Sequence, residues 1–241
     1  MKFTGERYVP GLDWPVIGLE HWHRYLFATP WVAGKQVLDI ACGEGYGSYL
    51  LAQQAARVIG VDVDIETLQH ASSTYLKGNL EFRRGECARI PVDGRHVFDV
   101  VVSFETIEHL DAAAQQALLL EVKRLLKPDG LFLVSTPNKL FYNGAPGTEN
   151  PFHLREYYVE EFRALLRNHF REVRLLGQKV YPMSYIWDVN EPATTCAEYG
   201  LEFTGKEFRP APPDKKVLYT LAVCTDGALT PSRSASIEVR T

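Results

Sequence analysis

The eleven residues from Val37 to Gly47, VLDIACGEGYG, constrain the fold more than any other part of the chain. A short apolar run reaches a carboxylate, Asp39, and three glycines then alternate with other residues before the apolar-periodic segment Tyr49 to Ala56. This order predicts a strand, a tight turn and a helix, the opening of a βαβ unit that binds a ligand at the helix N-terminus. Glycine suits such a turn because a backbone without Cβ bends sharply and lets a ligand approach closely.

Two acidic residues indicate what this turn binds. A turn that binds a dinucleotide presents N–H groups to a pyrophosphate, where a further carboxylate is unfavourable, so Asp39 favours a ligand that carries positive charge. Asp62 ends the next apolar run, 23 residues after Asp39, about where an acid accepts hydrogen bonds from ribose hydroxyls. A ribose together with a cationic group describes S-adenosylmethionine, and Asp39 at the same time disfavours a dehydrogenase.

Several segments resemble, in order, the motifs of class I S-adenosylmethionine-dependent methyltransferases. They are Asp39–Gly47, Gly60–Asp62, Arg84–Cys87, Phe98–Ser103 and Leu126–Gly130, and the resemblance extends over roughly residues 35–225. Ala41 stands where the family has the first glycine of its turn. The resemblance implies S-adenosylmethionine as the cofactor, bound by Asp39, Ala41, Cys42, Gly43, Gly45, Asp62, Val63, Glu86, Cys87, Ser103 and Arg24.

Two of these assignments have a plain alternative. In similar methyltransferases an acid at the position of Glu86 hydrogen-bonds the adenine amino group, but Glu86 could also be a turn residue that faces solvent. The segment Leu19 to Ala33 is expected to form a helix that closes over the methionine end of the cofactor, with Pro30 ending or kinking it. Arg24 on this helix is a candidate partner of the methionine carboxylate, which a guanidinium can bind with two hydrogen bonds. A surface arginine is the alternative.

Alternation of strand and helix along the chain predicts an α/β fold. We expect a Rossmann-like, doubly wound sheet of seven strands, mostly parallel, with an antiparallel last strand. The continuous apolar run Val97–Ser103 suits a central strand that is buried on both faces. Besides this strand and the one before the glycine turn, the expected strands are 58–62, 79–84, 131–135, 172–180 and 216–225. Besides the helices at 19–33 and 49–56, one helix is expected directly after Asp64 and two others at 112–126 and 157–170.

The chain is expected to contain one catalytic domain with additions. Residues 1–34 would form an arm and the closing helix, 35–225 the methyltransferase domain with an insertion at 181–213, and 226–241 a disordered tail. The net charge of −4 and the lack of a long basic block argue against nucleic acid as a partner. No apolar run is long enough for a membrane span, and four cysteines without a CxxC pair indicate reduced thiols in a cytoplasmic protein.

Catalytic candidates lie in two segments expected at the carboxyl ends of the strands. His109 and Glu108 follow the fourth strand, in a stretch that resembles the ExxEH segment of ubiquinone-type O-methyltransferases, and His153 lies in a later loop. A neutral histidine can take up the proton of a hydroxyl acceptor near pH 7. If the segment is helical, Glu105, Glu108 and His109 share one face. His109 could then be a base oriented by a carboxylate, the three could hold a divalent cation, or His109 could only fix the loop. We assign catalysis to His109, His153 and Glu108 and no metal ligand.

The acceptor is inferred only from a resemblance. The arm Phe3–Gly11 resembles the opening of a methyltransferase subfamily linked with bacterial polysaccharide and glycan modification. We therefore expect O-methylation of a sugar hydroxyl on a glycan or a nucleotide sugar, with a small-molecule or glycan partner and an oligomeric state that the sequence leaves open. The alternatives are another small metabolite, such as a phenol or an amine, and a cofactor-binding module without catalysis.

Overall fold

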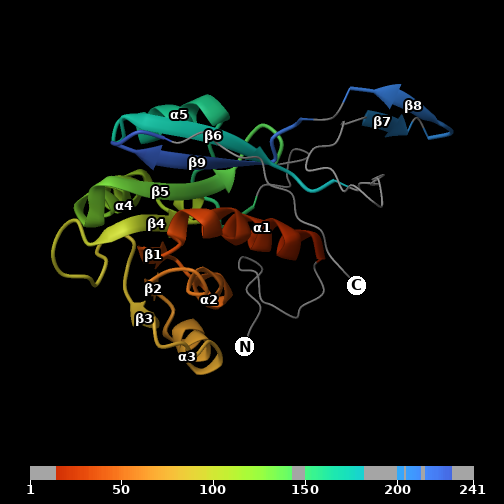
Figure 1. The fold of residues 1–241 in the computed structure, drawn as a ribbon. Coiled ribbons are helices and arrows are strands. Elements are labelled where there is room, and N and C mark those ends of the chain that lie inside the picture. Colours follow the sequence, from red (N-terminus) through yellow and green to blue (C-terminus); the bar gives the residue numbers. More distant parts are fainter. Residues whose placement is uncertain (1–14, 143–149, 182–199, 204, 213–214, 230–241) are drawn as a thin grey trace, which may run out of the picture.

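The computed structural model describes residues 15–142, 150–181, 200–203, 205–212 and 215–229 (Figure 1). The expected arm at 3–11, most of the expected insertion and most of the expected tail lie outside these residues. The described part is built on a sheet of seven strands in the order β3-β2-β1-β4-β5-β9-β6. The strands are β1 Gln36–Ile40, β2 Arg57–Asp62, β3 Leu80–Arg84, β4 Phe98–Ser103, β5 Leu126–Pro137, β6 Glu172–Gln178 and β9 Tyr219–Thr225.

Strands β1 to β5 run parallel to one another in this sheet. Strand β9 pairs antiparallel with both β5 and β6, so the expected antiparallel last strand is confirmed, although it lies between β5 and β6 and not at the edge. A separate hairpin, β7 Gly200–Phe203 and β8 Phe208–Ala211, falls within the segment expected to be an insertion. The fold is therefore the predicted Rossmann-like α/β sheet.

Helices cover both faces of the sheet, as Figure 1 shows. Helices α1 Pro15–Val32 and α2 Tyr46–Leu51 contribute to one apolar core, and α4 Ala112–Leu125 and α5 Val159–Arg167 contribute to the other. Neighbouring residues of a strand point to opposite faces, so Val37 of β1 packs into the first core while Leu38 and Ile40 pack into the second. Helix α3, Ile65–Thr74, begins directly after Asp64, as expected, and Oδ1 of Asp64 caps it by accepting a hydrogen bond from the backbone N–H of Glu66 at 3.0 Å.

Several expected boundaries were wrong. The helix after the glycine turn ends at Leu51 and not at Ala56, and α4 ends at Leu125, where β5 begins at the next residue and runs through Pro128. Pro30 does not stop α1, which continues to Val32. The hydroxyl of Thr29 donates to the carbonyl of Leu26 at 2.7 Å, which supplies the hydrogen bond that the missing N–H of Pro30 would otherwise make. Within the described residues, no helix is both long and apolar enough to cross a membrane.

Candidate active site

The carboxyl ends of the parallel strands meet at one edge of the sheet, and most of the candidate residues lie there. β1 ends at Ile40, β2 at Asp62 and β4 at Ser103. The chain proceeds from β1 outward to β2 and β3 and then returns to β4 on the other side of β1. Open α/β sheets bind ligands where the strand order reverses in this way, because the loops on either side diverge and leave a crevice.

Backbone hydrogen bonds fix the turn between β1 and α2. The N–H of Cys42 donates to the carbonyl of Val61 at 3.0 Å, and the N–H of Gly43 donates to Oδ2 of Asp62 at 2.9 Å. Gly43 has a φ of +52°, and a Cβ built on it would meet nothing within 4 Å. The turn therefore leaves open space beside Gly43, next to the carboxylate that was expected to bind a ribose.

Packing explains the other glycines of the motif. A Cβ on Gly47 would lie 2.1 Å from the ring of Tyr25, so only glycine lets α2 pack this closely against α1. A Cβ on Gly45, which has a φ of +83°, would lie 2.7 Å from Cβ of Ala71. Ala41 also adopts a positive φ, +58°, where an L-residue is strained. Ala41 thus replaces the family's glycine at a position where the backbone conformation favours glycine.

Asp39 is fully buried beneath this turn, with an exposed fraction of 0%. The hydroxyl of Ser48 donates to its Oδ2 at 2.6 Å, and the hydroxyl of Tyr25 donates to its Oδ1 at 3.2 Å. Burial raises the pKa of Asp39 to about 7, although these two hydrogen bonds act in the opposite direction. A carboxylate that is so costly to ionise gains from a positive charge placed nearby. The setting of Asp39 therefore agrees with a cationic ligand above the turn.

Asp62 joins the turn to the end of β2. Its Oδ1 accepts from the N–H of Asp64 at 3.0 Å, and its Oδ2 accepts from Gly43. Each carboxylate oxygen can accept more than one hydrogen bond, so the fixed carboxylate remains able to accept from two neighbouring hydroxyls. Val63, next to it, is 58% exposed, which leaves an apolar side chain available to a ligand.

The remaining predicted cofactor residues differ in their exposure. Glu86 is exposed beyond the end of β3, and Cys87 is partly buried, with burial raising the pKa of its thiol to about 11. Cys42 is buried in the turn. The hydroxyl of Ser103 is buried at the end of β4 and makes no hydrogen bond with the described residues. A buried hydroxyl without a partner at this edge suits contact with a ligand.

Arg24 is buried in α1, with an exposed fraction of 1%. Its guanidinium lies over the ring of Tyr219 at 4.7 Å, and its Nη1 is 3.5 Å from Oε1 of Glu105. None of its three side-chain nitrogens makes a hydrogen bond with the described residues. The surface-arginine alternative is therefore wrong. A buried guanidinium with unused donors fits an anionic group such as a carboxylate.

The segment after β4 is not the helix that would place three side chains on one face. Glu105 has a φ of +51°, and only Ile107–His109 form a single 3-10 turn. Glu105 consequently turns toward β5, where its Oε1 accepts from the hydroxyl of Ser135 at 2.5 Å. The condition under which Glu105 would share one face with Glu108 and His109, a helical segment, is therefore not met.

His153 takes the place of Glu105 in this group. The rings of His109 and His153 lie edge to face, 5.0 Å apart, and Oε1 of Glu108 is 3.9 Å from Nε2 of His109. Glu108 is fully buried, and burial raises its carboxyl pKa well above the usual range. The structure thus brings the three predicted catalytic residues, Glu108, His109 and His153, together.

Two tyrosines that the sequence did not single out connect this cluster with Arg24. The ring of Tyr142 stacks on His153 at 5.3 Å and meets the ring of Tyr219 edge to face at 5.6 Å. Tyr219 in turn lies under Arg24. Tyr142 belongs to the loop after β5 and Tyr219 to β9, so no local sequence pattern could have shown that they are neighbours.

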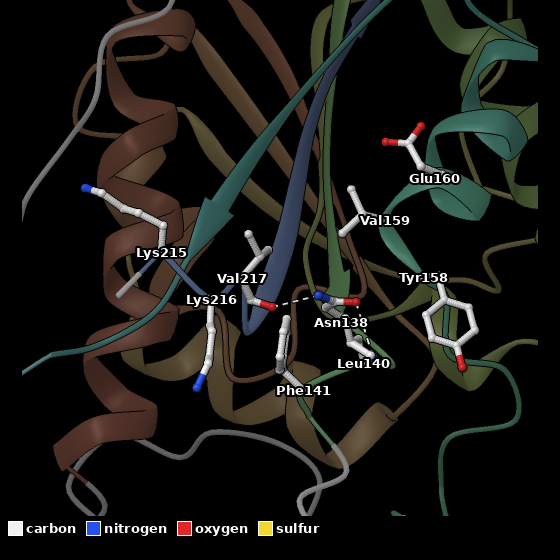
Figure 2. Close-up of a pocket in the computed structure, with 9 residues that line it drawn as sticks. All are labelled: Asn138, Leu140, Phe141, Tyr158, Val159, Glu160, Lys215, Lys216 and Val217. Carbon is white, nitrogen blue, oxygen red and sulfur yellow. Dashed lines mark hydrogen bonds between the residues drawn. The ribbon is translucent and has the colours of Figure 1, made fainter. Parts of the chain in front are cut away.

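An open groove of about 540 Å³ adjoins the end of β5. Figure 2 shows the side chain of Asn138 in it, held by a hydrogen bond of 2.8 Å from its Nδ2 to the carbonyl of Val217. The carbonyl of Asn138 accepts from the N–H of Tyr142, which links the groove to the histidine cluster. The groove is lined by Asn138, Leu140, Phe141, Tyr158, Val159, Glu160, Lys215, Lys216 and Val217.

Comparisons with known proteins agree with this geometry. A family model described as a methyltransferase domain matches residues 37–130. A probable S-adenosylmethionine-dependent methyltransferase of Mycolicibacterium smegmatis is 40% identical over 179 residues, which cover 72% of this chain and 66% of that protein. A ubiquinone biosynthesis O-methyltransferase of Psychrobacter arcticus is 33% identical over 112 residues, or 45% of this chain and 43% of that protein. The chain thus spans less than two thirds of either relative.

A solved S-adenosylmethionine-dependent methyltransferase of Thermotoga maritima has the same fold. It superposes with a TM-score of 0.59 over 87% of this chain and 90% of that one, at 15% sequence identity. At this identity the likeness concerns the fold alone. The glycine turn, the acids at the ends of β1 and β2, the strand order and the sequence relatives agree with one another. The chain belongs to the class I S-adenosylmethionine-dependent methyltransferases.

Proposed function

We propose that this protein transfers a methyl group from S-adenosylmethionine to a hydroxyl oxygen of a small acceptor. The observation that carries the proposal is the position of Glu108, His109 and His153 at the strand edge that also holds the glycine turn. One half of this edge offers groups for a cofactor, and the other half offers groups that can activate an acceptor. S-adenosylmethionine supplies an electrophilic methyl group on its sulfonium when it is bound.

The residues of the cofactor half have separable roles in this proposal. Asp62 would accept hydrogen bonds from the ribose hydroxyls, and Glu86 would do so from the adenine amino group. Asp39 beneath the turn would stabilise the cationic end of the cofactor, while Arg24 would bind its carboxylate. Methyl transfer is an in-line displacement, so positioning by such fixed groups supplies much of the rate.

The residues of the other half would act on the acceptor oxygen. The ring Nδ1 of His109 is 3.0 Å from the carbonyl oxygen of Phe152. A carbonyl oxygen only accepts, so this nitrogen carries the proton and the lone pair of the neutral ring is on Nε2. Two activating roles use that lone pair: Nε2 takes up the proton of the acceptor hydroxyl, or it binds a cation that polarises the oxygen.

A sugar hydroxyl on a glycan or a nucleotide sugar is the leading acceptor. Its support is the resemblance of the arm Phe3–Gly11, which lies outside the described residues. The groove of Figure 2 is lined by two exposed rings, Phe141 and Tyr158, and also by Lys215 and Lys216. These side chains suit the apolar face of a sugar and an attached anionic group. The likeness to a ubiquinone biosynthesis O-methyltransferase favours a phenol as the second candidate. An amine acceptor and a module without catalysis remain as rivals.

The proposal is tested by product analysis. The full chain would be incubated with labelled S-adenosylmethionine and with three acceptor sets: nucleotide sugars, isolated glycans and catechol-type phenols. Mass spectrometry of the products identifies the methylated atom. Methylation of a hydroxyl in any set supports O-methylation, and a phenol product moves the acceptor to the second candidate. Methylation only at nitrogen, or calorimetric binding of NAD with none of S-adenosylhomocysteine, would contradict the proposal.

A further inference from the structure

Three side chains at the acceptor side of the edge converge as the ligands of a metal ion would. A carboxylate oxygen of Glu108 and one ring nitrogen each of His109 and His153 all lie within 4.8 Å of one another. We propose that Glu108, His109 and His153 bind a divalent cation, which holds the oxygen of the methyl acceptor. Cation binding concerns the protein alone, whereas the role in methyl transfer rests on the proposed function.

Glu108 provides the first independent support. This residue is 0% exposed, its Oε2 accepts from the hydroxyl of Thr136 at 3.1 Å, and its Oε1 accepts no hydrogen bond from the described residues. That oxygen is directed to the cluster, 3.9 Å from Nε2 of His109. A buried carboxylate oxygen without a hydrogen bond is costly, and a cation at this point would compensate for it.

The orientation of both imidazole rings provides the second support. Nδ1 of His109 faces the carbonyl of Phe152 at 3.0 Å, and Nδ1 of His153 faces Oε1 of Glu156 at 2.7 Å. Both partners accept hydrogen bonds, so both rings carry their proton on Nδ1 and present the lone pair of Nε2. A carbonyl or carboxylate behind the ring is the usual arrangement for a histidine that ligates a metal, because it fixes both the ring and its tautomer.

The backbone holds the two histidine segments in register. The carbonyl of Glu108 accepts from the N–H of Leu154 at 2.8 Å and from the N–H of Arg155 at 3.0 Å. Together with the contact of His109 with Phe152, three hydrogen bonds therefore join the segment that carries His153 to the turn after β4. A site whose ligands are fixed before binding loses little entropy when the ion enters.

The spacing and the ligand types limit which ion fits. Ligands about 2.1 Å from a metal lie roughly 3–4.2 Å apart, so the 4.8 Å cluster needs only a small contraction. Nδ2 of Asn150 lies 3.0 Å from Nε2 of His153 and must move aside. Two imidazoles with one carboxylate suit first-row divalent ions, and three protein ligands leave positions open for an acceptor oxygen.

Such a cation would replace a general base. The acceptor hydroxyl would bind at an open position, where the charge of the ion makes its proton more acidic. The O–H bond breaks and the proton passes to solvent. The oxygen then forms a bond to the methyl carbon while the bond from that carbon to sulfur breaks, and the electron pair stays on sulfur. His109 would be a ligand throughout and not a proton acceptor.

Binding can be measured with Mn²⁺ alone, without cofactor or acceptor. The full chain, stripped with a chelator, would be titrated with Mn²⁺ and followed by electron paramagnetic resonance and calorimetry. We expect one saturable site, with affinity at least about tenfold weaker in Glu108→Gln and in His109→Ala. Glu108→Gln keeps the size of the side chain and the contact with Thr136. The matched control is His169→Ala, which removes a partly exposed histidine paired with Gln116 elsewhere on the protein.

The possible outcomes separate this inference from the proposed function. Absence of a saturable site, or equal affinity in the two cluster variants and the control, would overturn the cation site. Folding of each variant is checked by its binding of S-adenosylhomocysteine, which should stay within about twofold. If Glu108→Gln lost that binding as well, Glu156→Gln, which changes the group behind His153, would take its place, with the same weakening of Mn²⁺ binding expected. Full methyl transfer in excess chelator would overturn the role of the cation alone, and Mn²⁺ binding without any methyl transfer would overturn the function alone.

Discussion

The two halves of the strand edge are built in opposite ways. The cofactor half consists of one continuous turn, in which Gly43 hydrogen-bonds Asp62 and Asp39 lies beneath. The acceptor half consists of side chains from separate segments, Glu108 and His109 after β4 and His153 in the loop after β5. The first half uses backbone geometry and the second uses ring orientation and burial. A site that always binds the same cofactor can be formed by one short segment of the chain. An acceptor site can instead be assembled from several loops, which differ between proteins.

The largest expected effect tests whether the halves are independent. His109→Ala should lower kcat by about 10²-fold or more, because the acceptor oxygen loses the group that activates it. The affinity for S-adenosylhomocysteine should change by less than about twofold, because His109 belongs to the turn after β4 in the acceptor half and not to the glycine turn. Steady-state kinetics and calorimetry give the two numbers. If His109→Ala lowered kcat and the affinity for S-adenosylhomocysteine to a similar extent, the two halves would not be independent.

The next effect concerns the cofactor half alone. Asp62→Ala removes a fixed carboxylate that would accept from two hydroxyls, and such hydrogen bonds contribute roughly 1.5–3 kcal/mol. The affinity for S-adenosylhomocysteine should fall by about tenfold or more. Asp64→Asn is the control, because asparagine caps the start of α3 nearly as well as aspartate does. Unchanged affinity in a folded Asp62→Ala protein would place the ribose contact elsewhere.

Arg24 lies between the halves, and its variant shows to which half it belongs. Arg24→Met should weaken the binding of S-adenosylhomocysteine by roughly five- to tenfold, because the buried guanidinium no longer binds a carboxylate. Methylthioadenosine lacks the amino acid part of the cofactor, so its affinity should be the same in both proteins. Calorimetry with the two ligands measures this difference. Equal losses for both ligands would indicate a packing defect, and a changed KM for the acceptor alone would assign Arg24 to the other half.

The last prediction concerns the dependence of stability on pH, and not activity or affinity. The folded protein holds Asp39 at a pKa of about 7, above its ordinary value of 3.8, so the folded state binds more protons than the unfolded state between these pH values. Stability should therefore fall as the pH rises from about 4 to 7, by up to about 1.4 kcal/mol per pH unit from this group. Asp39→Asn has no such proton to lose, and its melting temperature should decline less over that window. If the melting temperatures of the two proteins declined equally over this pH range, Asp39 would not have a raised pKa in the folded protein.

The acceptor half shows where prediction from sequence was incomplete. The residues themselves were found, since histidine and glutamate after a buried strand are chemically conspicuous. The grouping with Glu105 depended on the segment being helical, whereas a positive φ at Glu105 turns that side chain toward Ser135 and Arg24. Tyr142 and Tyr219 gave no signal because an aromatic residue in a loop or strand is ordinary until its neighbours are known.

The sequence by itself determined the sheet, its antiparallel strand, the glycine turn and the acids at the ends of β1 and β2. These features are encoded by residues that are close together in the chain, through apolar alternation and the backbone freedom of glycine. Only the tertiary structure decided the burial of Arg24, the raised pKa of Asp39 and the meeting of His153 with Glu108 and His109. Burial and charge interactions depend on what surrounds a group in space, and here those surroundings come from segments that lie far apart in the chain.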